Sequence, residues 1–321
     1  LRRFVKMTKS LAPSGKASAV VLAILAGASF GVGGAISQIV AAAGFSVMQV
    51  CFGQYAFALA ILGILVALNF RPTTSPKEAA QLVVLGAVSS ISTFTYYLAI
   101  DMLSVNAAVA IQFQYVWIAV AFQAIFERKF PGKWTILSAA LIVVGTFFGS
   151  GMADEMLAGG LTMSPLGLLC AIVCAVFYAL FIYMNGRIAT DHHPVPRTFF
   201  EVIGGALLAS VLMPLNGGFA FDFIALAPWG ILMGVIMSVI PVLLIVAASD
   251  RLSGGLVAIL TSTELPMAVL AGALILGETV TPLIIVGVCV ILTAIVLAQL
   301  DGRPRREADS GIEEPMQSTD A

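Results

Sequence analysis

Ten apolar runs of membrane-spanning length occupy most of this sequence. The runs are 17–42, 46–68, 79–100, 104–126, 134–150, 165–186, 198–214, 225–248, 254–276 and 280–299. A helix that crosses a bilayer needs about 20 mostly apolar residues. Only 10% of the residues are charged, whereas a soluble domain is about one quarter charged. A chain with so little charge cannot cover a water-facing surface, so we expect an all-α integral membrane protein with ten transmembrane helices.

Every basic residue falls on one side when the ten runs are threaded through a membrane in order. With the N-terminus in the cytoplasm, the cytoplasmic segments are 1–16, 69–78, 127–133, 187–197, 249–253 and the C-terminal tail, and they hold all 16 Lys and Arg residues. The opposite side carries only acids, which are Asp101, Asp154, Glu155, Asp222 and Glu278. Because positive loops stay in the cytoplasm, this distribution predicts a protein of the cytoplasmic membrane with both termini inside. Basic residues scattered over loops also predict no nucleic-acid partner.

The two halves of the sequence contain an internal repeat. Asp101, Leu103 and Ser104 match Asp250, Leu252 and Ser253 at an offset of 149, and Glu127 and Pro131 match Glu278 and Pro282 at an offset of 151. Each half has five spans, an odd number, so the copies run through the membrane in opposite directions. Inverted repeats of this kind are typical of secondary transporters, whose substrate cavity lies between the halves.

This repeat divides the chain into four parts. We expect a basic cytoplasmic arm at 1–16, a first five-helix repeat at 17–150, a second, inverted five-helix repeat at 165–299 and a disordered cytoplasmic tail at 300–321. Small-residue pairs, Gly27 with Gly31 and Gly145 with Gly149, predict close helix approaches within the membrane.

Three stretches resemble the EamA-type transporters of the drug/metabolite transporter superfamily. They are AGASFGVGGAISQ (26–38), AVFYALFIYMNGRIA (175–189) and VAILTSTELPMAVLAGALILGETVTPLIIVGVCVILTAIVLA (257–298). The last stretch is similar to the family's ninth and tenth helices, with Pro266 mid-helix. The resemblance implies two inverted EamA-like repeats, and the nearest branch is that of the YddG-type amino-acid exporters. The first half has Tyr115 or Trp117 where the family has this proline, so we expect that half to bend less easily.

Glu264 is the main candidate for a substrate-binding residue. It lies about ten residues into its span, or about 15 Å at 1.5 Å per residue, near the membrane midplane. We expect it to be the only carboxylate at that depth. Pro266 has no N–H, so the carbonyl of Ser262 should lose its partner and the helix should have a hinge there. Polar groups at this depth are costly and indicate function by default, although Glu264 could instead serve a structural hydrogen bond.

Other polar and aromatic side chains are further candidates for lining the cavity. In the first repeat, Gln112 and Gln114 lie near the position that matches Glu264, and Gln114 shares a helical face with Trp117. The full set of candidate substrate-binding residues is Glu264, Gln112, Gln114, Tyr115, Trp117, Ser37, Gln38, Gln54, Tyr96, Tyr97, Tyr178 and Thr263, with Pro266 as the hinge. Each of them could instead join neighbouring helices.

The expected absence of Lys and Arg from the spans limits the substrate. A cavity with one carboxylate, amides and aromatic rings disfavours phosphorylated molecules and suits an ammonium group. We therefore expect export of neutral or aromatic amino acids, or related small metabolites, by alternating access. Proton-coupled export of cationic drugs or amines is the alternative, with Glu264 trading a proton for the substrate.

Enzyme and channel functions remain as remote alternatives. The only histidines, His192 and His193, lie in a loop, and no His or Asp cluster lies within the spans, so we expect neither catalysis nor a metal site. The run GVGG (31–34) lacks the Lys-Ser/Thr of a nucleotide-binding loop, and no cofactor is expected. We expect lipid and the small-molecule substrate as partners, with the chain a monomer or a weak homodimer.

Overall fold

The structure, a computed structural model, describes residues 15–70, 73–160, 164–213 and 222–302. Regular structure within these ranges is entirely helical. The first repeat contains α2 (Lys16–Ala42), α3 (Val47–Asn69), α4 (Pro76–Met102), α5 (Val105–Gln112), α6 (Tyr115–Glu127), α7 (Lys133–Gly149) and the short α8 (Met152–Leu157). The second contains α9 (Pro165–Asn185), α10 (Pro194–Leu212), α11 (Phe223–Met233), η2 (Gly234–Val239), α12 (Ile240–Ser249), α13 (Gly254–Thr261), α14 (Glu264–Ala271), η3 (Gly272–Leu276), α15 (Pro282–Ala298) and η4 (Gln299–Gly302).

The all-helical membrane fold is confirmed. Among the described residues, nine helical segments are long and apolar enough to cross a bilayer, and α7 is a shorter apolar helix of 17 residues. The composite spans are α5 with α6, α11 with η2 and α12, and α13 with α14 and η3. Most of the expected N-terminal arm and C-terminal tail lie outside the described residues.

Serine caps set the starts of several helices. Ser46 and Ser75 each form a capping box with the residue three positions on, Gln49 and Glu78, which satisfies N–H groups that a helix start leaves free. Ser104 and Ser253, which match in the sequence repeat, cap α5 and α13 in the same way, each accepting from the N–H three residues later. The repeated sequence therefore produces the same local structure in both halves.

The fourth and ninth spans are interrupted at matching positions, 113–114 and 262–263. At the first break the N–H of Gln114 donates to the carbonyl of Ile111, and at the second the N–H of Ser262 donates to the carbonyl of Ile259. These i−3 bonds tighten the turn. The side chain of Gln114 donates to the carbonyl of Ala110 at 3.1 Å, and the hydroxyl of Ser262 donates to that of Ala258 at 3.1 Å. Polar side chains thus accommodate both breaks.

Two expectations about Pro266 are therefore wrong. The first half, which has no proline here, is broken at the matching position, so it is not the straighter half. The carbonyl of Ser262 does not lose its partner either, because the N–H of Leu265 donates to it at 3.3 Å. Pro266 lies in the first turn of α14, where the missing N–H costs little.

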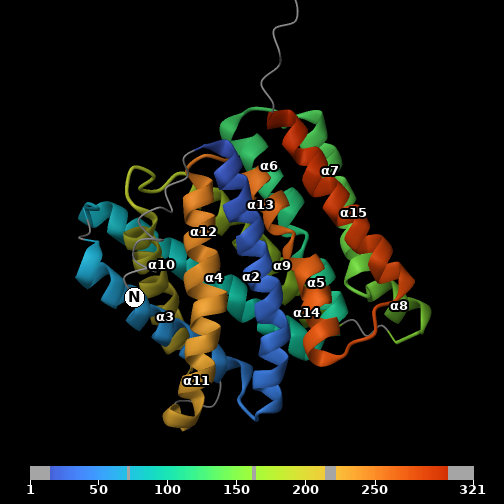
Figure 1. The fold of residues 1–321 in the computed structure, drawn as a ribbon, viewed down its shortest axis with the longest axis horizontal. Helices are drawn as coiled ribbons and strands as arrows, with labels where there is room; N and C mark the ends of the chain where they lie inside the picture. The colour runs from blue at the N-terminus through green and yellow to red at the C-terminus, as the bar shows by residue number, and fades with distance from the viewer. Residues whose placement is uncertain (1–14, 71–72, 161–163, 214–221, 303–321) are drawn as a thin grey trace, which may run out of the picture.

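The helices of the two halves pack in corresponding ways (Figure 1). The first helix of each half crosses the broken span of the other half: α2 packs on α13 and α14, and α9 packs on α5 and α6. The last helices, α7 and α15, lie side by side. Glycines allow these approaches, since a Cβ added at Gly31 would lie 2.3 Å from the carbonyl oxygen of Glu264, and one at Gly287 would lie 2.1 Å from the amide nitrogen of Gly149.

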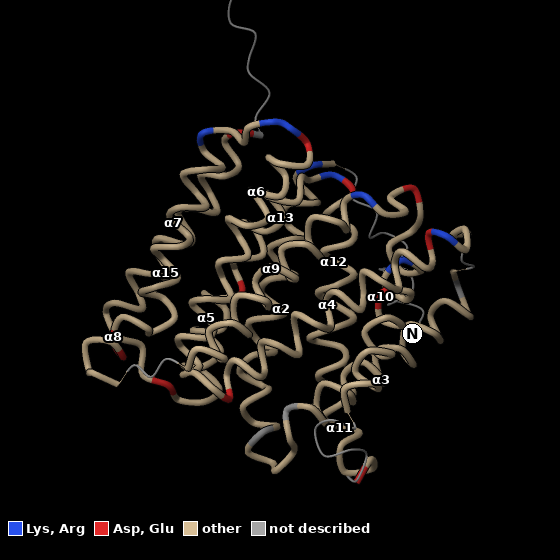
Figure 2. Tube along the Cα trace, turned by 180° about the vertical axis from the view of Figure 1, so that it is seen from behind, with Lys and Arg blue, Asp and Glu red and all other residues tan. Residues whose placement is uncertain are grey.

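Charge is segregated along the helix bundle (Figure 2). The Lys and Arg positions gather at one end of the helices, which we call the basic end. This end includes the loop between α6 and α7 and the segments after α9 and α12. Acidic residues mark the opposite, acidic end, where Asp154, Glu155 and Glu278 lie near α8 and the loop before α15.

Candidate functional site

A cavity of about 1090 Å³ lies between the two halves. Its walls come from α2, α3, α4, α5, α9, α10, η2, α14 and η3, with single residues or pairs from α7, α8, α12 and α15. The lining reaches the exposed residues Ala158 and Thr279 at the acidic end. In the other direction it ends at Phe181 and Glu201. The cavity is therefore accessible from the acidic end.

Carboxylates are the only charged groups in the lining. They are Asp154, Glu155, Glu201, Glu264 and Glu278, and no described Lys, Arg or His lines the cavity. The remaining polar surface is hydroxyl and amide, from side chains such as Ser92, Thr93, Asn106 and Gln112. Such a lining attracts cations and repels anions.

Ion pairs and aromatic contacts join the helices at the basic end. Arg187 pairs with Glu127 at the end of α6, and its guanidinium lies 3.7 Å from the ring centroid of Tyr183. The rings of Phe126 and Tyr183 are 5.5 Å apart. A second pair, Arg197 Nη1 with Asp250 Oδ1 at 2.6 Å, joins the start of α10 to the end of α12.

Glu264 lies at the first position of α14, directly after the break, and lines the cavity. No hydrogen bond or ion pair joins its carboxylate to another described side chain. The N-terminal end of a helix favours a nearby negative charge. The backbone at Glu264 is held by its contact with Gly31 of α2, so the break places this carboxylate at the wall of the cavity.

Eight of the twelve candidate residues line the cavity. They are Ser37, Gln38, Gln54, Tyr96, Tyr97, Gln112, Tyr178 and Glu264. Tyr178 lies edge-to-face with Phe30 at 6.3 Å. The amide of Gln54 donates to Ser238 Oγ at 2.9 Å, and that of Gln38 donates to Glu278 Oε1 at 3.4 Å.

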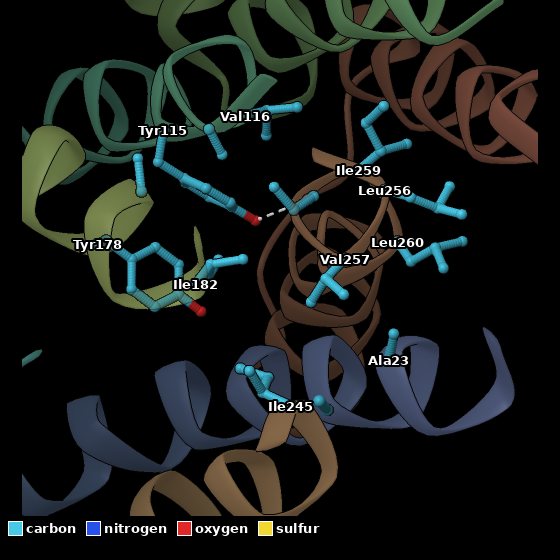
Figure 3. Close-up of a cluster of buried hydrophobic side chains, with 14 of the residues drawn as sticks. Ala23, Tyr115, Val116, Tyr178, Ile182, Ile245, Leu256, Val257, Ile259 and Leu260 are labelled. Carbon is cyan, nitrogen blue, oxygen red and sulfur yellow. Dashed lines mark hydrogen bonds between the residues drawn. The ribbon is translucent and has the colours of Figure 1, made fainter. Parts of the chain in front are cut away.

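The other four candidates lie outside the lining. Gln114 accepts at Oε1 from the Trp117 indole at 2.9 Å, and Trp117 is 47% exposed on the outer surface of the bundle. Tyr115 is fully buried and points at α13 within an apolar cluster (Figure 3), where its hydroxyl lies 3.2 Å from Thr261 Oγ1. Thr263 donates to the carbonyl of Ile24 at 2.9 Å. These four side chains therefore hold helices together or face outward.

Two statements about charge in the spans are wrong. Arg197 is a fully buried residue of α10, so a basic residue does lie within an apolar helix, although it does not line the cavity. Glu264 is not the only deep carboxylate, because Glu201 is 2% exposed, lies on α10 and lines the cavity. A sequence signal was present in Pro194, the first residue of α10, since proline favours that position. A helix that starts there has Glu201 two turns inside.

The sequence matches the model of the EamA-like transporter family over residues 17–150 and 165–300. The chain belongs to this family. EamA-like proteins are multi-pass membrane transporters, and the family is not one of enzymes.

Relatives and a solved structure agree with this assignment. The chain is 24% identical to the threonine/homoserine exporter RhtA of Salmonella typhimurium strain LT2 over 248 residues, which cover 75% of this chain and 79% of the relative. The RhtA protein of Escherichia coli K12 is 23% identical over the same length. A crystal structure with 15% identity matches 88% of this chain and 98% of its own with a TM-score of 0.71, which shows a shared fold and nothing further.

Proposed function

We propose that this EamA-like transporter exports small molecules that carry a protonated amine, with neutral amino acids as the first class to test. The main support for this proposal is the charge of the cavity, which is lined by five carboxylates and no described basic side chain. The names of the RhtA relatives, threonine and homoserine exporters, add support for amino acids and for the outward direction.

Glu264 is the proposed site of the substrate's ammonium group. No hydrogen bond or ion pair links its carboxylate to a described side chain, and the rings of Tyr96 and Tyr178 line the same cavity. A carboxylate pairs with an ammonium, and aromatic faces add cation–π attraction. The carboxylate of an amino acid would bind to uncharged donors, for which Gln112 and Asn106 are available in the lining.

Alternating access is the proposed mode of transport, and the charge difference between the two ends supports an orientation. By the positive-inside rule, we infer that the basic end and both termini face the cytoplasm. The cavity would then open outward, with the Glu127–Arg187 pair closing the cytoplasmic side. Export would require the opposite state, in which the halves rock to open the basic end.

Counterflow in proteoliposomes tests this function. Purified full-length protein is reconstituted into vesicles loaded with unlabelled threonine, and uptake of labelled threonine, homoserine, phenylalanine and simple amines is measured against a sugar phosphate. We expect amino acids or amines to exchange and the phosphate not to. No counterflow of any amino acid or amine would overturn the proposal.

Glu264→Gln tests the residue assignment. Because a hydrogen bond to a charged group is worth about 1.5–3 kcal/mol, the half-saturation concentration should rise about 10- to 150-fold. The matched control is Trp117→Phe, a change outside the cavity, which should leave counterflow unchanged. Equal behaviour of the two variants would remove Glu264 from the substrate site.

The volume of the cavity supports one second candidate, the export of larger cationic drugs or amines. A space of about 1090 Å³ is at the upper end of small-molecule sites. Competition of hydrophobic cations against labelled threonine in the same vesicles separates the two. Strong inhibition together with their own uptake would favour the drug class.

A further inference from the structure

Glu201 is a buried carboxylate that forms no hydrogen bond or ion pair with a described residue. Its side chain is 2% exposed and lines the cavity, and neither carboxylate oxygen has a hydrogen-bond partner among the described residues. Buried polar groups in proteins are almost always paired, and an unpaired buried charge is strongly unfavourable. A group left in this condition needs a partner that enters from the cavity.

Tight packing between α4 and α10 fixes the position of Glu201. A Cβ added at Gly86 would lie 1.7 Å from the carbonyl oxygen of Glu201, and one at Gly204 would lie 1.8 Å from that of Val83. The two backbones therefore touch at this level. The backbone of α10 at Glu201 is therefore held against α4, and it cannot shift to bring the carboxylate to another partner.

The other half of the protein contains the same crossing with a neutral side chain. A Cβ added at Gly234 would lie 2.9 Å from the carbonyl oxygen of Gln54, and Gln54 also lines the cavity. Both Gln54 and Glu201 are the eighth residue of their helices, α3 and α10. At the crossing in that half, the side chain is the neutral amide of Gln54, which donates a hydrogen bond to Ser238. A carboxylate is therefore not required for this packing.

Two neighbouring groups act on Glu201 without bonding to it. Arg197, one turn earlier on α10, and the side chain of Asn185 at the end of α9 favour its charged form. The two terminal nitrogens of Arg197 are already bonded to Asp250 and to the carbonyl of Asn185. Tyr55 of α3 packs on α10 at Gly205 and hydrogen-bonds with Thr93 at 3.4 Å.

Among the described residues, the remaining helices that pack on α10 bring no further cation to the level of Glu201. The α4 residues that line the cavity at this level are Gly86, Ser89 and Thr93, none of which ionises, and from α12 the titratable group is Asp250, already paired.

We propose that Glu201 is a second cation site, which takes up a monovalent cation, H⁺ or Na⁺, in exchange for the ammonium substrate. The cation enters through the open acidic end, binds at the Glu201 carboxylate oxygens and is released at the other side after the halves rock. Substrate export is thereby coupled to cation entry, with Glu264 holding the substrate and Glu201 the coupling ion. This inference rests on the proposed function.

The test compares exchange with gradient-driven transport in the same proteoliposomes. Wild-type vesicles should transport threonine or an amine faster under either a pH gradient or a Na⁺ gradient, with matching flux of H⁺ (a trapped pH dye) or of ²²Na⁺. Glu201→Gln, which makes this position like Gln54, should keep counterflow at equal pH and salt and lose the gradient response. Glu201→Asp, which keeps the carboxylate, should retain that response.

Asp101→Asn is the matched control, since it removes an exposed carboxylate outside the cavity lining; it should retain the gradient response. A Glu201→Gln variant that still couples would overturn the proposal. Wild-type protein that exchanges substrate but responds to neither gradient would also overturn it, whether or not the variant folds. Absence of all counterflow would instead contradict the proposed function itself.

Discussion

The Arg197–Asp250 pair predicts a large loss of stability when Asp250 is replaced by Asn. Arg197 is fully buried and Asp250 is 18% exposed at the side chain, with 2.6 Å between Nη1 and Oδ1. Burial raises the pKa of the Asp250 carboxyl, and the neighbouring Arg197 offsets part of that shift. Asp250→Asn would remove the only charged partner bonded to the buried guanidinium among the described residues, although its bond to the Asn185 carbonyl remains.

The expected magnitude follows from burial. Breaking a buried ion pair by removing one partner costs about 3–5 kcal/mol. At about 2.1 cal/mol/K of unfolding entropy per residue, a chain of 321 residues would lose about 4–8 °C in melting temperature. The comparison is Glu127→Gln, whose pair with Arg187 is about one third exposed on both sides. Exposed pairs contribute about 0.2–1 kcal/mol, or less than about 2 °C.

Thermal unfolding in detergent measures this difference with the chain's own thiols. Cys51 and Cys174 are buried in the folded protein, so a dye that fluoresces on reaction with thiols reports their exposure. The double variant Arg197→Met/Asp250→Leu removes both charges and should recover most of the loss. Equal melting temperatures for Asp250→Asn and Glu127→Gln would refute the argument, because burial would then have no influence on the cost.

Two more predictions concern packing and gating. Gly86→Ala places a methyl group 1.7 Å from the Glu201 carbonyl oxygen and should destabilise the protein by about 1–3 kcal/mol. The control Gly34→Ala adds a methyl group with nothing within 4 Å and should not change stability. Equal melting temperatures for the two variants would contradict the tight α4–α10 crossing. Glu127→Gln removes the pair at the basic end and should favour opening there by up to about fivefold, since 1 kcal/mol is about a factor of five. The measurement uses a variant in which Cys174, which lines the cavity, is the only cysteine. A thiol-alkylating reagent added from the basic side should then react with Cys174 faster. An unchanged rate would mean that the ion pair does not keep that end closed.

Much of the membrane architecture could be predicted from local features of the sequence. The length of the apolar runs fixes the spans because the bilayer has a fixed thickness, and matched caps such as Ser104 and Ser253 show that equal local sequences give equal helix starts. Glu264 could be identified as a candidate because a lone carboxylate in an apolar run is visible without a structure.

Only the tertiary structure decided which side of each helix meets the cavity. Gln112 lines it, but Gln114, two residues further on, bonds with Trp117 on the outside. Glu201 was missed because the residues before it look like a loop, and only the contact of α10 with α4 at Gly86 shows how deeply the carboxylate is buried. The physical reason is that lipid and a protein interior are both apolar, so a helix that is hydrophobic all round carries no pattern that distinguishes them. The partners of each face are fixed only when the helices pack.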